Sequence, residues 1–142
     1  MEKIMEIFVA AVRNPILQLV ALAIVCDTIF GVIRAIKEHK FNSNVGIDGA
    51  LRKTGMVISI AFLHIADQIT SVNLIGFIPD TAREHLGLQS VGLAEFFAII
   101  YLAYETTSIL KNMALCGLPV KAIWDKLKAL LGKYTAELPD DE

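Results

Sequence analysis

The chain has 142 residues, of which 55% are hydrophobic and 20% are charged, and its mean hydropathy is +0.58. One small core cannot bury that much apolar surface, so the composition indicates a single-domain integral membrane protein. The formal net charge of −2 excludes a basic nucleic-acid-binding protein as the leading interpretation. The sequence contains no phosphate-binding loop, nucleophile elbow or zinc signature, and we therefore expect no enzyme activity and no cofactor.

Three apolar stretches approach the length of about 20 residues that a helix needs to cross the hydrocarbon layer. Asn14 and Pro15 precede the first stretch, and this pair is typical of helix starts because the missing N–H of proline costs nothing there. The second stretch is strongly apolar for only 16 residues, so it must extend toward Gly76 and Pro79 to reach across. The predicted spans are residues 16–36, 54–75 and 91–113.

Two shorter amphipathic helices are also predicted. Asp80, followed by Thr81 and Glu84, indicates the capped start of a helix that ends at Gly87. Apolar residues recur at helical spacing over residues 118–134, with lysines on much of the remaining surface.

The helix over residues 118–134 is predicted to be cytoplasmic, and two interpretations of it are open. It either packs against a partner helix or lies on the inner leaflet, with Trp124 in the interface and its lysines toward anionic headgroups. Residues 1–117 would form the membrane domain, and residues 135–142 would be a disordered acidic tail.

The basic residues are unevenly distributed, and this asymmetry predicts an orientation. Two lie before the first span, five between residues 34 and 53, one in the second connection, and five from Lys111 onward. Short connections rich in Lys and Arg remain in the cytoplasm. A three-span protein satisfies the pattern with its N-terminus outside and its C-terminus in the cytoplasm of a bacterial cell.

Five ionisable residues fall within or near the ends of the predicted spans, where each charge costs about 2.5–3.5 kcal/mol on insertion scales. Such side chains must face one another, a partner subunit or water, or else take up protons. Together with stripes of small residues, they favour self-association into a homo-oligomer. These residues are Asp27, His64, Asp67, Glu95 and Glu105.

Helical spacing places small residues beside several of these polar ones. Asp27, Gly31 and Ala35 are four residues apart and share one stripe of the first span, where close approach of another helix is expected, within the chain or from another copy. Gly55 and Ser59 repeat the spacing in the second span. His64 and Asp67 share a face, Glu95 and Glu105 need not line the same surface, and no third metal ligand lies near His64.

Several short motifs, in their order and spacing, resemble the phage holin and toxin-secretion holin family, especially the holin-like proteins encoded beside large clostridial glucosylating toxins. The resemblance covers most of the chain. The matching segments are Asp27-Thr28 with Gly31 and Ala35, Lys40-Phe41-Asn42-Ser43, Gly46-Ile47-Asp48-Gly49, Arg52-Lys53, Glu95-Phe96-Phe97, Tyr104-Glu105, Ser108-Ile109-Leu110-Lys111-Asn112 and Cys116-Gly117-Leu118-Pro119.

The resemblance implies a small protein that oligomerises in the bacterial cytoplasmic membrane and opens lesions that release a large toxin or a muralytic enzyme. The motif-rich connection over residues 40–53 is expected to be a cytoplasmic turn, with Asp48 as the N-cap of the second span. The turn residues are Ser43, Gly46, Asp48, Gly49, Arg52 and Lys53.

The fold class predicted from these observations is an all-α membrane protein with three transmembrane helices and a cytoplasmic amphipathic helix. The leading function is a self-assembling, holin-like pore whose partners are the lipid bilayer, further copies of itself and the released cargo. Two alternatives are a small ion or proton channel that uses the buried acids, and a non-pore, antiholin-like regulator that binds another channel through the Gly31 stripe.

Overall fold

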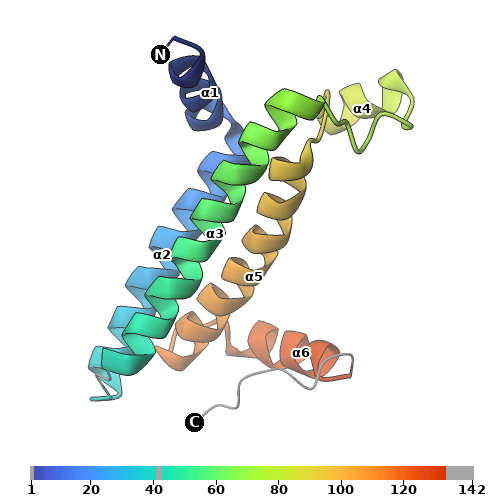
Figure 1. Cartoon of the computed structure of the whole chain (residues 1–142). Coiled ribbons are helices and arrows are strands. Elements are labelled where there is room, and N and C mark those ends of the chain that lie inside the picture. Colours follow the sequence, from blue (N-terminus) through green and yellow to red (C-terminus); the bar gives the residue numbers. More distant parts are fainter. Residues whose placement is uncertain (1, 41–42, 134–142) are drawn as a thin grey trace.

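Figure 1 shows the computed structural model, which describes residues 2–40 and 43–133, without the side chains of residues 43–45. Every regular element in these ranges is a helix, which confirms the predicted all-α class. The helices are α1 (Glu2–Arg13), α2 (Pro15–Lys37), α3 (Ser43–Thr70), α4 (Asp80–Leu86), α5 (Leu93–Leu115) and α6 (Lys121–Leu131).

The three long helices α2, α3 and α5 run in alternating directions and form an elongated bundle (Figure 1). Helix α5 packs most extensively on α2 and also packs on α3. Helices α1 and α4 lie at one end of the bundle, and α6 crosses the other end (Figure 1). The two ends of the described chain therefore lie at opposite ends of the bundle.

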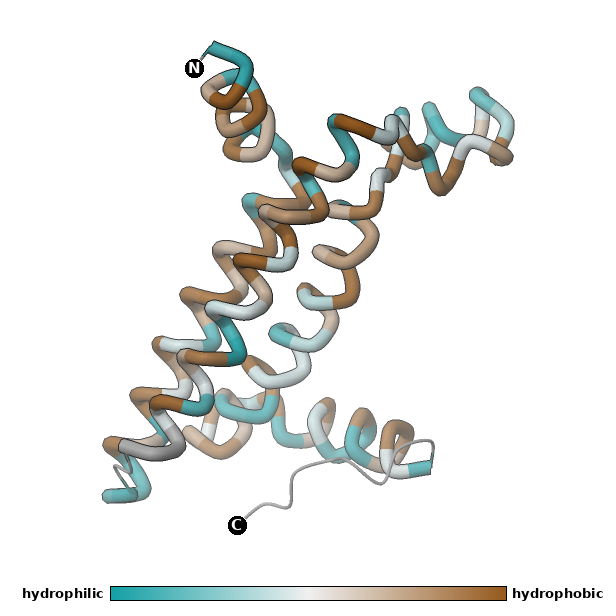
Figure 2. The backbone as a smooth tube through the Cα atoms, viewed as in Figure 1, coloured by the Kyte–Doolittle hydropathy of each residue, from teal (hydrophilic) through white to brown (hydrophobic). Residues whose placement is uncertain are grey.

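The core is narrow, and most apolar side chains of the bundle face outward. Leu17 and Val20 of α2, Ile60 of α3 and Ala98 of α5 form the buried apolar cluster. Large exposed hydrophobic residues cover the outer surfaces of the three long helices, for example Leu22 at 64% and Phe62 at 69% exposure, and they give the bundle its apolar surface (Figure 2).

Two helices in the described ranges, α2 and α5, are long and apolar enough to cross a membrane. Less than a quarter of the most apolar stretch of each is buried within the chain, whereas the core helix of a soluble protein would be mostly buried. Helix α3 is the longest of the described helices, but polar residues such as Lys53, His64 and Asp67 interrupt it. It is therefore not apolar enough to count as a candidate membrane span by the criterion that α2 and α5 meet. The second predicted span is therefore not confirmed.

The predicted start of α2 is confirmed in atomic detail. Asn14 is the N-cap, its Oδ1 atom accepts hydrogen bonds from the backbone N–H groups of Ile16 and Leu17, and Pro15 occupies the first helical position. The short helix α4 and its end at Gly87, with φ of 67°, are also confirmed. The expected side-chain cap of α4 is wrong, because Pro79 occupies the N-cap position and makes no such bond.

The turn predicted over residues 40–53 is wrong, because α3 begins at Ser43 and continues through all the later residues of that segment. Gly46, Asp48, Gly49, Arg52 and Lys53 lie inside the helix, so Asp48 is not its N-cap. Each glycine lowers the stability of a helix by about 1 kcal/mol relative to alanine. The packing of Lys53 and Met56 into the bundle stabilises the helix and offsets this loss. Phe41 and Asn42 lie outside the described residues.

Helix α3 also ends earlier than predicted, at Thr70 instead of residue 75. Ser71 adopts a left-handed backbone conformation with φ of 52°, and its N–H donates to the Asp67 carbonyl at 2.8 Å. This geometry stops the helix. Helix α3 therefore extends beyond the second apolar stretch at its N-terminal side and not toward Gly76.

Trp124 is buried, at 5% exposure, which favours the packing interpretation of the C-terminal amphipathic helix for that side chain. Ile123 and Leu130 remain exposed on the same helix. The acidic tail predicted at residues 135–142 lies outside the described residues.

Candidate functional site

The centre of the bundle holds a cluster of charged and amide side chains contributed by all three long helices. The Lys53 Nζ atom donates to Asp27 Oδ2 at 2.8 Å and to Glu105 Oε2 at 2.5 Å. The Asn112 Nδ2 atom donates to the other Asp27 oxygen, Oδ1, at 3.0 Å. We call these four residues the central cluster.

The central cluster is nearly dry. Asp27 is 5%, Glu105 0% and Asn112 8% exposed, and the Lys53 side chain is 14% exposed. Asp27 and Glu105 each lie one residue beyond the midpoint of a 23-residue helix, α2 and α5 respectively. The polar groups therefore occupy the middle of the two most apolar helices, where an unpaired charge is most costly.

The charges of the central cluster do not balance. Two carboxylates face one ammonium group, and within the described residues the Glu105 Oε1 atom is buried without a hydrogen-bond partner. A buried polar atom without a partner costs about 1–3 kcal/mol. The central cluster thus leaves one buried polar atom unsatisfied among the described residues, which an apolar core would not do.

An open groove between α2 and α3 runs beside Lys53. Thr28 and Val32 of α2 line one side, and small residues of α3, among them Gly46 and Gly49, line the other. A Cβ atom at either glycine would meet no atom within 4 Å. Lys53 itself is among the residues that line the groove.

A second polar network joins the three long helices at the α1 end of the bundle. The Asp67 carboxylate, near the end of α3, accepts hydrogen bonds from the backbone N–H groups of Leu93 and Ala94 at 2.8 Å each. It therefore caps the N-terminus of α5 from another helix, where a negative charge is favourable.

Glu95 completes that network on α5. Its Oε2 atom accepts from the Gly92 N–H at 2.9 Å, and its Oε1 atom accepts from Asn14 Nδ2 at 2.6 Å. Asn14, Asp67, Gly92 and Glu95 are called the end clamp. The end clamp links the start of α2, the end of α3 and the start of α5.

His64 and Asp67 do not act as a pair in this structure. The His64 Nε2 atom lies 3.2 Å from the Ile7 carbonyl oxygen of α1, whereas Asp67 is bonded to α5. Ser59 bonds the Tyr101 hydroxyl at 2.9 Å, and Gly55 faces open space. No group of three potential metal ligands gathers in the described parts of the chain.

The Gly31 stripe faces the chain's own α5. Asp27 contacts Asn112, and a Cβ atom added at Gly31 would lie 3.8 Å from Asn112 Nδ2, while Ala35 is half-buried. Of the two alternatives left open for Gly31, the structure supports close packing within the chain.

Gly31→Ala is expected to be tolerated, because a contact of 3.8 Å is ordinary van der Waals packing, and alanine favours a helix by about 0.5–1 kcal/mol. Gly31→Leu should lower the free energy of unfolding by about 1–3 kcal/mol, because the longer side chain must displace Asn112 from Asp27. Detergent-induced unfolding followed by circular dichroism measures both. Equal midpoints for the two variants would contradict this packing.

The opposite end of the bundle has its own link between α2 and α5. Lys37 Nζ donates to the Leu115 carbonyl at 3.0 Å, which places a cation at the C-terminus of α5. Gly117 follows in the left-handed region with φ of 90°. Arg52 lies over the Tyr104 ring, 5.2 Å from its centroid, and joins α3 to α5.

The sequence pattern assigned Lys53 to a turn, gave Asn14 a role only at the start of a helix and not as a partner of Glu95, and gave Asn112 and Gly92 no role of their own. Helical spacing contains a signal for two of them. Lys53 is in register with the buried Met56 and Ile60 of α3, and Asn112 follows Glu105 by seven residues on α5. Asn14 and Gly92 lie at helix starts and carry no comparable periodic signal.

Comparison with known proteins decides the family. The model described as the bacteriophage holin family matches residues 3–133. The chain belongs to this family. The holin-like protein TcdE of Clostridioides difficile is 45% identical over 123 residues, which cover 86% of this chain and 74% of that relative. No solved structure matches this holin-family chain.

Family membership explains the exposed apolar surfaces of α2 and α5. A holin-family chain is a membrane protein, and exposed apolar side chains such as Leu22 and Ile100 fit a membrane environment better than water. The resemblance inferred from the sequence motifs is thereby confirmed.

Proposed function

We propose that this protein oligomerises in the bacterial cytoplasmic membrane and forms a pore that permits release of a toxin or an endolysin. The central cluster carries the proposal. Charged side chains at the midpoint of apolar helices are retained in membrane proteins chiefly where they serve a function. Here two carboxylates and a lysine are shielded within one chain, and their exposure to water would line an aqueous path.

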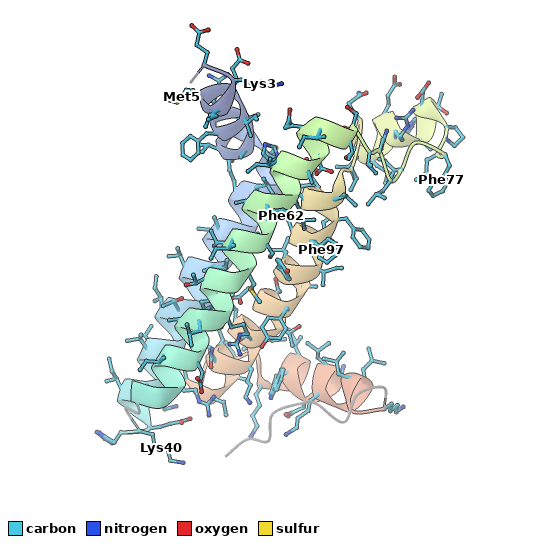
Figure 3. All side chains as sticks on the ribbon, viewed as in Figure 1. Lys3, Met5, Lys40, Phe62, Phe77 and Phe97 are labelled. Carbon is cyan, nitrogen blue, oxygen red and sulfur yellow. The ribbon has the colours of Figure 1, made fainter. Side chains whose placement is uncertain are left out.

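The proposed arrangement is three membrane passes, through α2, α3 and α5, with the N-terminus outside and α6 in the cytoplasm. The alternating direction of the long helices and the position of α1 and α6 at opposite ends support an odd number of passes (Figure 1). Lys40 lies at the α6 end, whereas Lys3 and Met5 lie at the other end with Phe77 (Figure 3).

Two basic residues contribute less to the predicted orientation than their positions in the sequence suggest. Lys53 and Lys111 were counted among the cytoplasmic charges, but both side chains are largely buried in the bundle. Lys37, Lys40 and the lysines of α6 remain as charges at the proposed cytoplasmic end. The asymmetry remains, because these five lysines compare with three basic residues, Lys3, Arg13 and Arg83, at the end that holds α1 and α4.

Opening is proposed to require separation of Lys53 from Asp27 and Glu105. In the closed chain these groups neutralise one another in part, and the end clamp and the Lys37–Leu115 bond hold the two ends of the bundle. Association of several copies would let the same polar faces meet water. Gly55 and Ser59 lie at the α3 surface and its edge and are candidates for contact between copies.

Induced expression in bacteria that contain a cytoplasmic reporter enzyme tests the function. The proposal predicts prompt growth arrest with escape of the reporter into the medium. Loss of membrane potential without reporter escape would instead indicate the ion or proton channel. Membrane permeability that stays the same as in uninduced cells would favour the antiholin-like regulator.

In the same assay, Asp27→Leu should abolish reporter escape while the protein still fractionates with the membrane, because an apolar side chain replaces a charged group that is proposed to line the aqueous path. Ile29→Leu, at an exposed position two residues away, is the matched control and should release normally. Normal release by Asp27→Leu would exclude the central cluster from the mechanism.

A further inference from the structure

Helix α1 carries an apolar face that no other part of the described chain covers. Its members recur at helical spacing and form one arc: Ile4 at 73%, Met5 at 62%, Phe8 at 64%, Val9 at 38% and Val12 at 55% exposure. The four charged residues of α1 lie on the opposite arc, namely Glu2, Lys3, Glu6 and Arg13. A polar solvent on all sides would leave this arc unfavourably exposed.

The arc has a fixed position relative to the bundle. Ile7 and Ala11 are half-buried, and the Ile7 carbonyl oxygen contacts His64 of α3. The Gln18 Nε2 atom donates to the Val12 carbonyl at 2.8 Å across the break between α1 and α2. These contacts attach α1 to the bundle and leave its apolar arc facing outward.

The arc adjoins the surface that faces lipid. Helix α2 starts two residues after α1 ends, and its exposed Leu19 and Leu22 belong to the apolar surface of the bundle. Figure 1 shows that α1 is inclined to the axis of α2 and does not extend it. Figure 2 shows apolar residues in both α1 and the long helices, with a short hydrophilic stretch at the break between α1 and α2.

We propose that α1 lies in the boundary between headgroups and acyl chains of one leaflet, with the arc from Ile4 to Val12 in the acyl region. The partner is the bilayer of the membrane that the bundle already occupies, at the end that holds α4. The inference depends on membrane residence and not on pore formation.

The net charge of α1 indicates which lipid headgroups its binding depends on. Its two acidic and two basic residues cancel, whereas α6 has three lysines against one aspartate. Binding of α1 is therefore apolar in origin and independent of anionic headgroups, unlike that of a basic interfacial helix. The two ends of the bundle would therefore bind their leaflets through different interactions, apolar burial at α1 and attraction of lysines to anionic headgroups at α6.

The test is the accessibility of nitroxide labels on the full chain in phosphatidylcholine vesicles. In a Cys26→Ala/Cys116→Ala background, labels are introduced through Phe8→Cys and Met5→Cys on the arc. Glu6→Cys, on the polar side of the same helix, is the matched control. Collision with oxygen, which concentrates in acyl chains, is compared with collision with a water-soluble nickel chelate.

Labels at positions 5 and 8 should show a several-fold higher ratio of oxygen to nickel collisions than the label at position 6, and adding phosphatidylglycerol should leave the ratio unchanged. Low collision with both reagents at positions 5 and 8 would indicate a protein contact, such as a second copy, and would overturn the proposal. High nickel collision would place the arc in water and also overturn it. The measurement needs no release activity, so its failure is distinct from failure of the pore proposal.

Discussion

Lys53→Met is expected to lower the free energy of unfolding by about 3–5 kcal/mol and to abolish reporter release. Removal of the ammonium group takes from Asp27 and Glu105 the cation that both contact, and breaking a buried ion pair from one side typically costs this much. The midpoint of detergent-induced unfolding, followed by circular dichroism, measures the change.

Two further variants separate the central cluster from a general effect of losing a lysine. Lys40→Met removes an exposed lysine at the end of the bundle and should leave the midpoint unchanged. Asp27→Asn/Lys53→Met/Glu105→Gln removes all three charges together and should recover most of the stability without recovering release. A wild-type midpoint for Lys53→Met alone would show that the ion pairs contribute nothing to the closed bundle.

Gly92→Ala is expected to destabilise the bundle by about 1–3 kcal/mol, because a Cβ atom there would lie 2.6 Å from Asp67 Oδ2 and 2.8 Å from Glu95 Oε2. The backbone at Gly92 has φ of −84°, which any residue adopts, so the cost arises from contact and not from backbone strain. The two carboxylates would have to move away from the N–H groups of α5 that they cap.

Gly55→Ala is the matched control for Gly92→Ala. Its added Cβ atom would meet nothing within 4 Å, and alanine in a helix interior should leave stability unchanged or raise it by about 0.5–1 kcal/mol. In an Asp67→Ala background the penalty of Gly92→Ala should shrink, because the nearest obstructing oxygen is absent. An undiminished penalty in that background would contradict the proposed geometry of the end clamp.

The positions of the long helices were largely predictable. Residues 16–36 and 91–113 were predicted as spans, and the helices found there are Pro15–Lys37 and Leu93–Leu115. Apolar length and helical period are local properties of a chain, so they can be identified without knowledge of its neighbours.

The limits of α3 were not predictable in the same way. Gly46, Asp48 and Gly49 have the local preferences of a turn, yet the chain is helical there because later residues of the helix pack into the bundle. Helix α1 was not predicted either, although Ile4, Ile7, Phe8 and Ala11 follow the helical period.

The sequence by itself determined that this is a helical membrane protein, and it identified Asp27, His64, Asp67, Glu95 and Glu105 as polar residues that need partners. Tertiary structure alone decided which partners they have. The bonds of the central cluster join residues separated by 26, 52 and 85 positions in the chain. Pairing over such separations depends on how each helix is rotated and shifted against its neighbours, and no local pattern encodes that rotation.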